Sequence, residues 1–330
     1  MLTRPRDLPE DVLVSTLARR WDLRVTALAY RPFGFGSHHW EVTDEAGGRW
    51  FVTVDELETK KLWAGESLDA ALDRLRAALA AAADLRALGA EFVVAPVATR
   101  DGEPLAWILG RFGVALYPYL HGQSFTWGGF ATPAHRRAVL ALVIAVHTAP
   151  AAARRRARTD DFTIPHRDEL EAALDPRAEV ADCGPYARPA AALVAGHAPA
   201  IRRRLARYDE LAALGRAQAD RMVLTHGEPH PGNTLLTAEG WRLVDWDTAL
   251  VAPPERDLWL LDPGDGSTLE AYAAATGVPA LPAMLELYRL RWDLADIAVE
   301  VSRFRRRHAG TADDDQAWEI LRSWIEKAAL

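Results

Sequence analysis

Cysteine is nearly absent from this chain of 330 residues, in which Cys183 is the only one. A single cysteine excludes an internal disulfide framework and fits a reducing compartment. Long apolar runs are scarce as well, because the longest strongly apolar stretch, residues 139–146, is too short to span a membrane. The N-terminal sequence MLTRPRDLPEDV lacks the apolar core of a signal peptide. We therefore expect a soluble cytoplasmic protein with no membrane partner.

An excess of basic residues is also missing, since the formal net charge is −7. That balance argues against nucleic acid as a partner. The arginine runs at 154–156 and 202–204 lack the glycine and aromatic interleaving of nucleic-acid motifs, so we expect them on solvated helix faces. Hydrophobic residues make up 49% of the chain, which is ordinary for a globular protein and sufficient for a sizeable core in one or two domains.

One stretch is dense in polar side chains of the kinds that carry chemistry. Residues 225–247 read THGEPHPGNTLLTAEGWRLVDWD. Strand-like runs at 223–225, 234–237 and 241–244 predict a strand, a polar loop and a hairpin. The tripeptide at 238–240 predicts a three-residue hairpin loop, with its glycine where positive φ is most needed.

A three-residue loop also predicts the register of the hairpin. Thr237 would lie opposite Trp241, and one step beyond the last pair Asn233 would lie opposite Asp245. Directly opposed residues in an antiparallel pair have Cβ atoms about 5 Å apart. An amide and a carboxylate at that spacing suit a hard cation, so we expect Asn233 and Asp245 to bind Mg²⁺. Glu228, in the adjoining loop, is the nearest candidate general base.

The same stretch resembles the catalytic core of the aminoglycoside phosphotransferase family, which is related to choline kinase and protein kinases. The residues that carry the resemblance are His226-Gly227-Glu228, His230-Pro231-Gly232-Asn233 and Val244-Asp245-Trp246-Asp247. Together with the segment at 253–259, PPERDLW, they look closest to spectinomycin-type phosphotransferases. Within this stretch one residue departs from the family, because Glu228 stands where the family has its catalytic Asp.

The resemblance implies an α+β, bilobal, protein-kinase-like fold. An N-terminal lobe for the nucleotide, residues 1–116, would hold an antiparallel sheet and one long helix. A hinge at 117–122 would lead to a larger, mainly helical C-terminal lobe at 123–330. Residue patterns agree with this expectation. They predict strands at 25–30, 38–43, 49–54, 92–98, 105–109 and 114–119, and helices from Glu10, at 68–88, within 134–222 and at 287–304.

The predicted nucleotide site has three parts. Gly34, Gly36 and Ser37 lie between two predicted strands, where glycine lets backbone N–H groups approach phosphates, although an ordinary hairpin turn is the alternative. By resemblance, the backbone of Pro118, Tyr119 and Leu120 would hydrogen-bond adenine, while the alternative is a strand end with aromatic packing. The third part, the strand lysine that grips phosphates in kinases, is missing, because Asp55 occupies the matching run.

Two lysines follow closely and leave two interpretations open. Lys60 and Lys61 could supply the missing cation from a loop, or they could be solvated surface lysines. Kinases also use a helical acid to orient that lysine, and Glu66, Asp69 and Asp73 are the candidates here.

The remaining polar residues receive roles mainly from the resemblance. His226 would be a structural brace rather than a proton carrier. His230, Asp247 and Asp257 would contact the substrate, with Asp257 also suited to cap the next helix or to brace the catalytic loop. The acids on the predicted helix near 287–304 would be available to a cationic ligand.

Three functions follow. The first is a kinase that transfers the γ-phosphate of ATP or GTP, with Mg²⁺, to a hydroxyl of an aminoglycoside, an aminocyclitol or a similar cationic molecule, as in antibiotic resistance. The second is a pseudokinase-like protein that binds a nucleotide or small molecule without turnover, which the residues at 55 and 228 would favour. The third, a metallohydrolase using His226, Glu228 and His230, requires a helix that Pro229 and Pro231 disfavour.

Overall fold

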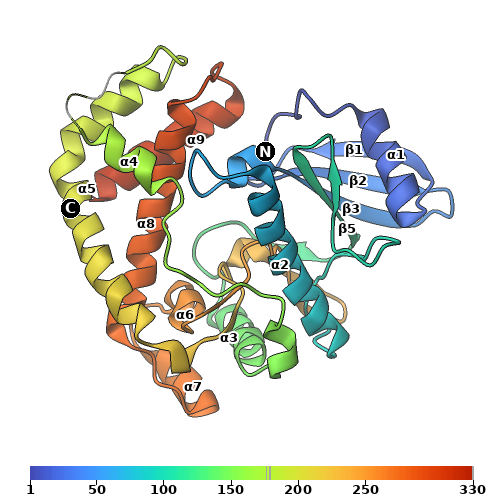
Figure 1. The fold of residues 1–330 in the computed structure, drawn as a ribbon. Coiled ribbons are helices and arrows are strands. Elements are labelled where there is room, and N and C mark those ends of the chain that lie inside the picture. The colour runs from blue at the N-terminus through green and yellow to red at the C-terminus, as the bar shows by residue number, and fades with distance from the viewer. Residues whose placement is uncertain (176, 178–179, 329–330) are drawn as a thin grey trace.

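The computed structural model describes residues 1–175, 177 and 180–328, and it folds into two lobes (Figure 1). The N-terminal lobe is a five-stranded antiparallel sheet in the order β1-β2-β3-β5-β4. Its strands are β1 (Val25–Arg31), β2 (His38–Asp44), β3 (Arg49–Glu56), β4 (Ala106–Ile108) and β5 (Phe112–Pro118). The helices α1 (Glu10–Trp21) and α2 (Leu68–Ala87) accompany it. The predicted bilobal fold is thereby confirmed.

The two faces of this sheet pack against different parts of the molecule. Strand residues alternate between faces. Trp40 and Val42 of β2, with Val52 and Val54 of β3, are buried in one core with Leu13 of α1. The alternate residues Phe51, Thr53 and Asp55 therefore point to the opposite face. There Ala115 and Tyr117 of β5 pack with α2, so this face looks toward the second lobe.

Helix α2 links the lobes. The hydroxyl of Ser67 accepts a hydrogen bond from the N–H of Ala70 at 3.1 Å, so Ser67 is the N-cap residue of the helix. Leu72, Leu75 and Leu79 pack under the sheet, whereas Ala78, Ala82 and Leu85 join a core that contains Val146 and Trp246 of the C-terminal lobe. The helix predicted at 68–88 is confirmed, and it ties the sheet to the catalytic region.

The C-terminal lobe is mainly helical. Its helices are α3 (Pro133–His147), α4 (Arg167–Ala173), α5 (Ala187–Arg216), α6 (Glu255–Leu261), α7 (Ser267–Thr276), α8 (Pro282–Phe304) and α9 (Ala312–Ala328). Short strands β6 (Gln123–Ser124), β8 (Thr234–Thr237) and β9 (Gly240–Leu243) form one sheet, and β7 (Val223–Thr225) with β10 (Leu250–Ala252) forms another. The main core lies where α8 packs against α5 and α9. None of the helices in the described ranges is long and apolar enough to cross a membrane.

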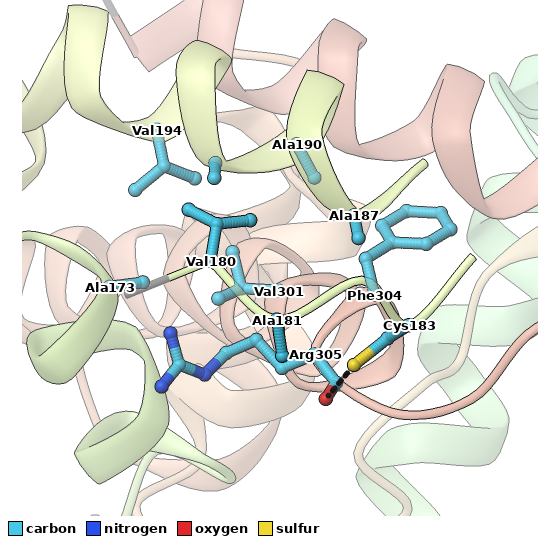
Figure 2. Close-up of a pocket in the computed structure, with 11 residues that line it drawn as sticks. Ala173, Val180, Ala181, Cys183, Ala187, Ala190, Val194, Val301, Phe304 and Arg305 are labelled. Atoms are coloured by element: carbon cyan, nitrogen blue, oxygen red, sulfur yellow. Dashed lines mark hydrogen bonds between the residues drawn. The ribbon is translucent and has the colours of Figure 1, made fainter. Parts of the chain in front are cut away.

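A small cavity of about 90 Å³ lies in this lobe beside α5 and α8 (Figure 2). Alanine and valine side chains make up most of its wall, and the thiol of Cys183 donates to the carbonyl of Arg305 at 3.3 Å. No residue of the predicted site lines it.

Two sequence predictions about elements were wrong. Residues 92–98 are not a strand of the N-terminal sheet, because the start of the segment bonds the C-terminal hairpin: Leu243 donates to Phe92 at 2.8 Å and Val94 donates to Leu243 at 3.1 Å. Further along, Val97 donates a single hydrogen bond to Leu116 of β5 at 2.7 Å. The predicted role of Asp257 as a helix cap is also wrong. Helix α6 begins at Glu255 after Pro254, so Asp257 lies inside the first turn instead of capping it.

Candidate active site

The loop after β7 is held from beneath by His226. Its Nε2 lies 2.9 Å from the carbonyl oxygen of Val244, and the N–H of Glu228 donates to its Nδ1 at 3.1 Å. The ring is fully buried against Trp246, and burial lowers the pKa of His226. A neutral ring with Nε2–H donating satisfies both contacts. This geometry suits a brace for the loop and leaves no free nitrogen for proton transfer.

Asp257 fixes the same loop from α6. Its Oδ2 accepts the N–H of His226 at 2.9 Å, its Oδ1 accepts the N–H of Gly227 at 2.6 Å, and His147 of α3 contacts Oδ2 at 3.0 Å. Burial opposes ionisation, but the hydrogen bond and charge of His147 hold the pKa of Asp257 below its usual value. The carboxylate is fully buried, so the predicted substrate contact does not fit its position. It braces the loop, in agreement with the other interpretation.

Gly227 is required by this packing. Its φ is +101°, a region that favours glycine, and a Cβ there would lie 2.4 Å from the guanidinium of Arg256. Arg256 in turn donates to Thr225 at 2.9 Å and to the carbonyl of Thr248 at 2.7 Å. The sequence therefore folds into a tight turn that presents Glu228. The segment is not helical, which confirms the argument against a zinc-hydrolase motif.

The predicted hairpin register was wrong by one residue. Thr237 pairs with Gly240 and Thr234 with Leu243, so the loop has two residues, Ala238 and Glu239. The N–H of Val244 donates to the carbonyl of Asn233 at 3.0 Å, which places Val244 rather than Asp245 at that level. A one-residue slip reverses the face of each side chain. Asp245 follows with φ of +66°, and this left-handed residue redirects the chain after the strand.

The acids that follow the hairpin form an electrostatic cluster. Burial raises the pKa of Asp245, and the charges of Asp247, Glu228 and Asp55 raise it further. The amide nitrogen of Asn233 donates to the carbonyl of Glu228 at 3.0 Å, which orients its oxygen away from that bond. Carboxylates crowded around a single nearby ammonium leave negative charge that a divalent cation would neutralise. The donor chemistry of Asn233 and Asp245 thus fits Mg²⁺, although the described residues contain no preformed group of three or more His, Cys, Asp or Glu ligands.

That ammonium belongs to Lys60. Its Nζ lies 2.7 Å from Oδ2 of Asp247 and 3.0 Å from Oδ1 of Asp55. Burial alone would lower the pKa of Lys60, but the two carboxylates outweigh it and raise the pKa well above the usual value. The side chain is 23% exposed, so the interpretation as a solvated surface lysine was wrong for Lys60. Asp247 is likewise paired beside the acid cluster and is not directed to solvent.

The glycine-rich loop lies over this cluster. Gly34 and Gly36 have φ of +76° and +82°. The hydroxyl of Ser37 donates to Asp55 at 2.6 Å, so any contact of Ser37 with a nucleotide would use its backbone. Phe33 stacks on His39, which stacks on Phe51, with ring centroids 5.0 and 5.2 Å apart. The loop is therefore supported by an aromatic stack on the open face of the sheet.

The predicted hinge residues follow the last long strand. β5 ends at Pro118, and β6 then pairs with β8 of the C-terminal lobe, so residues 119–122 connect the two sheets. The ring of Tyr119 packs against the guanidinium of Arg49, whose carbon lies 3.9 Å from the ring centre. The strand-end packing is present, and it leaves the adenine-binding role of Pro118, Tyr119 and Leu120 as a prediction.

On the other side of Glu228 lies a wall of aromatic rings. Trp127 stacks on Trp292 of α8 with centroids 5.2 Å apart, and its ring meets the edge of His230 at 4.4 Å. His230 Nε2 lies 3.6 Å from Oε2 of Glu228. Within the described ranges, the buried nitrogens His230 Nδ1 and Trp292 Nε1 have no hydrogen-bond partner. Trp127 is 53% exposed, so part of this wall is open to a ligand.

Acids of α8 stand behind the aromatic wall. Burial first, and then the charges of Glu228, Glu300 and Asp293, raise the pKa of Asp296 to about 8. Burial also raises the pKa of Glu300 to about 7. A protonated amine placed among these groups would favour their ionised forms. Sequence reasoning pointed to acids on this helix, but it missed Trp127 and Trp292, whose contact joins segments far apart in the chain.

A glycine-rich loop on an antiparallel sheet, a braced polar loop and a hairpin followed by acids together define a kinase-like phosphotransferase. The chain belongs to the phosphotransferase enzyme family, whose sequence model matches residues 29–288. It is similar to protein StrN of Streptomyces griseus, at 33% identity over 245 residues, which is 72% of each chain.

Solved structures show the same fold at low identity. One is spectinomycin phosphotransferase APH(9)-Ia in complex with ADP and spectinomycin, with a TM-score of 0.70, 17% identity and 98% of each chain covered. Another is choline kinase LicA from Streptococcus pneumoniae, with a TM-score of 0.58, 14% identity, and coverage of 96% of this chain and 99% of that chain. These likenesses confirm the predicted resemblance and the fold.

Proposed function

We propose that the protein is a kinase that transfers the γ-phosphate of ATP or GTP to a hydroxyl of a small cationic molecule, most specifically an aminocyclitol or aminoglycoside. The observation that carries this proposal is the position of Glu228. Its side chain is 32% exposed, and it lies between the acid and lysine cluster on one side and His230 with the aromatic wall on the other.

The chain supplies a route for the proton. Glu228 would accept a hydrogen bond from the acceptor hydroxyl, orient its oxygen toward the γ-phosphorus and take its proton late in the reaction. The new P–O bond forms at that oxygen as the bond between the γ-phosphorus and the β–γ bridging oxygen breaks, and the nucleoside diphosphate leaves. His226 accepts the N–H of Glu228 and Asn233 donates to its carbonyl, while Asp257 accepts the N–H groups of the two preceding residues. The longer side chain of Glu228 therefore starts from a fixed backbone.

The nucleotide would lie against the open face of the N-terminal sheet. The backbone of Gly34, Gly36 and Ser37 would meet the phosphates, and the segment 118–120 would meet the base. Asn233 and Asp245 would hold Mg²⁺, which supplies charge neutralisation of the phosphates when bound. Asp247, paired with Lys60, belongs to this phosphate side rather than to the acceptor.

The acceptor would lie against the aromatic wall. Trp127 and Trp292 offer ring faces, and Asp296 offers a carboxylate, a combination that attracts protonated amines. The relatives support this choice, because APH(9)-Ia is described with spectinomycin bound. Phosphorylation of an antibiotic hydroxyl in the cytoplasm would then give resistance.

The test is transfer from labelled ATP or GTP, with Mg²⁺, to a panel of aminocyclitols, aminoglycosides and simple amino alcohols. Mass spectrometry of the product identifies the modified hydroxyl. Transfer to at least one cationic acceptor supports the proposal. Nucleotide binding with no transfer to any acceptor would instead support the pseudokinase alternative, which rests on Glu228 and Asp55.

A further inference from the structure

Strand β3 has an acid, Asp55, in the run where kinase folds place a phosphate-binding lysine. We propose that Lys60, the last residue of the short 3-10 helix Leu57–Lys60 after β3, is the residue that binds the nucleotide phosphates in this protein. This inference rests on the proposed function, because it assigns a residue to the nucleotide of that reaction.

The ammonium of Lys60 contacts two carboxylates and can donate one further hydrogen bond. Asp55 and Asp247 take two of its contacts, at 3.0 and 2.7 Å. A lysine ammonium has three N–H donors, so one donor is left for an anion. Ser37 also donates to Asp55 and holds that carboxylate in place. Asp55 therefore serves as a support for the lysine instead of a replacement for it.

The ammonium of Lys60 lies at the predicted phosphate site. A Cβ built on Gly36 would lie 3.8 Å from Nζ of Lys60, so the charge lies directly beneath the glycine-rich loop. On the opposite side it contacts Asp247, two residues after Asp245. A phosphate between the glycine-rich loop and the predicted metal ligand would therefore meet this ammonium.

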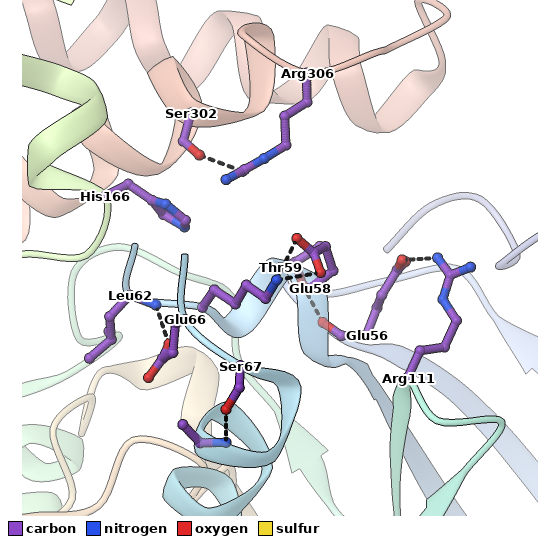
Figure 3. A network of polar contacts seen from close by, with 12 residues as sticks. Glu56, Glu58, Thr59, Leu62, Glu66, Ser67, Arg111, His166, Ser302 and Arg306 are labelled. Carbon is purple, nitrogen blue, oxygen red and sulfur yellow. Dashed lines mark hydrogen bonds and ion pairs between the residues drawn. The ribbon is translucent and has the colours of Figure 1, made fainter. Parts of the chain in front are cut away.

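The loop that carries Lys60 is fixed from both lobes. Arg74 of α2 donates to the carbonyl of Lys60 at 2.6 Å and forms an ion pair with buried Glu66. Glu66 accepts the N–H of Leu62 at 2.7 Å, and the N–H of His166 in the C-terminal lobe donates to the carbonyl of Leu62 at 2.6 Å. Figure 3 shows Leu62, Glu66 and His166 around this loop. Glu66 thus positions the backbone of the lysine, whereas Asp73 pairs with Arg76 at the surface.

Lys61 provides a matched control. It follows Lys60 in the chain, yet its ammonium lies 2.8 Å from Glu58, whose side chain is 47% exposed. Replacing either lysine by methionine removes one positive charge from the same loop. Only Lys60 contacts the acids beneath Gly36.

The experiment compares binding of ADP with Mg²⁺ and binding of adenosine, by calorimetry, in the wild-type protein, Lys60→Met and Lys61→Met. Loss of a charge-assisted hydrogen bond predicts that Lys60→Met binds ADP about 10- to 100-fold more weakly. Adenosine affinity and both affinities of Lys61→Met should stay within about twofold of wild type. Equal ADP affinity in Lys60→Met and wild type would overturn the inference and leave the proposed function intact. Wild-type protein that binds no nucleotide would overturn both.

A second measurement needs no variant and covers the case in which Lys60→Met fails to fold. Wild-type protein is acetylated with an amine-reactive ester, with and without ADP and Mg²⁺, and the modification of each lysine is followed by peptide mass spectrometry. ADP should slow the modification of Lys60 at least about fivefold, relative to Lys61, and adenosine should not. Equal rates with and without ADP would contradict a phosphate contact at Lys60.

Discussion

The ammonium of Lys60 lies 2.7 Å from Oδ2 of Asp247, and this ion pair joins residues 187 positions apart in the chain. Lys60 follows β3 of the N-terminal lobe, whereas Asp247 follows the C-terminal hairpin. The pair therefore connects the two lobes at the point where the glycine-rich loop meets the acid cluster. Any anion that binds there must share the ammonium with Asp247.

Glu66 fixes the backbone segment that carries Lys60. It is 5% exposed and binds both Arg74 and the N–H of Leu62, so Glu66→Gln removes a charge from the support of the loop. We predict ADP binding that is about 3- to 10-fold weaker, with adenosine affinity unchanged, because one buried hydrogen bond to a charged group is weakened. Calorimetry measures both affinities. Glu58→Gln, which alters an exposed acid on the same loop, is the control and should have no effect.

Glu228→Gln separates chemistry from binding. An amide keeps the shape of the side chain but cannot take a proton from the acceptor. We predict a fall in kcat of about 10²- to 10⁴-fold, the usual contribution of a general base, with nucleotide affinity nearly unchanged. Steady-state kinetics and calorimetry provide the two readouts. Glu239→Gln, at the exposed turn of the hairpin that follows, is the control. Unchanged turnover in Glu228→Gln would remove Glu228 from the base role.

Asp257→Asn should unfold more easily at neutral pH. The substitution leaves two backbone N–H groups and His147 facing a neutral amide in a fully buried position. We predict a loss of about 1–3 kcal/mol in the free energy of unfolding, measured in urea at pH 7. The surface variant Asp101→Asn should change it by less than about 1 kcal/mol.

The pH dependence of that loss has a definite sign. The folded pKa of Asp257 is depressed, so its stabilisation is present above the unfolded pKa of about 3.9 and is lost as pH falls through the folded value. The difference between wild type and Asp257→Asn should therefore shrink below about pH 4. A difference that is constant from pH 7 to the acid transition would contradict the role of the charge.

The raised pKa of Asp296 predicts the opposite dependence of stability on pH. Its folded pKa is raised to about 8, so the folded protein retains a proton that the unfolded chain releases above about pH 4. Wild-type stability should fall relative to Asp296→Asn as pH rises from about 4 to about 8. Urea unfolding at pH 5 and pH 8 measures this change, and a constant difference between the two proteins would contradict the shift.

The same carboxyl should couple acceptor binding to proton release. A cationic acceptor favours the ionised form, so its affinity should rise between pH 6 and pH 8 in wild type and rise less in Asp296→Asn. Calorimetry in buffers of different ionisation enthalpy counts the released protons. The charged groups that act on Asp296 are the acids Glu228, Glu300 and Asp293. Two of these acids have cationic partners of their own: Arg204 and Lys327 pair with Asp293, and Arg303 pairs with Glu300.

Local signals in the sequence predicted most of the fold. Alternating apolar residues placed β2 and β3, the leucine spacing placed α2 and α8, and the catalytic loop followed from its motif. The predicted hairpin register was wrong because a two-residue loop and a three-residue loop differ only in the partner of Thr237. In the structure that partner is Gly240, which has φ of +114°. The strand predicted at 92–98 was wrong because the backbone of Phe92 and Val94 bonds Leu243, a contact between distant parts of the chain that no local pattern encodes.

Some residues of the candidate site could likewise be predicted from the sequence, and others could not. Motif residues such as His226 and Asp257 could be named from the sequence, since their spacing is nearly local. Lys60 could not be separated from Lys61 by sequence, because only the fold brings Asp247 and Gly36 to one of them. The aromatic wall was missed for the same reason, since Trp127 and Trp292 meet only in the folded chain.

The most direct test of the central claim is transfer of phosphate from ATP or GTP to a cationic acceptor, measured with wild type and Glu228→Gln in parallel. Our account predicts Mg²⁺-dependent transfer to a single hydroxyl of an aminocyclitol or aminoglycoside by the wild type, and its loss in Glu228→Gln with nucleotide still bound. Nucleotide binding without transfer to any acceptor in the panel would contradict it.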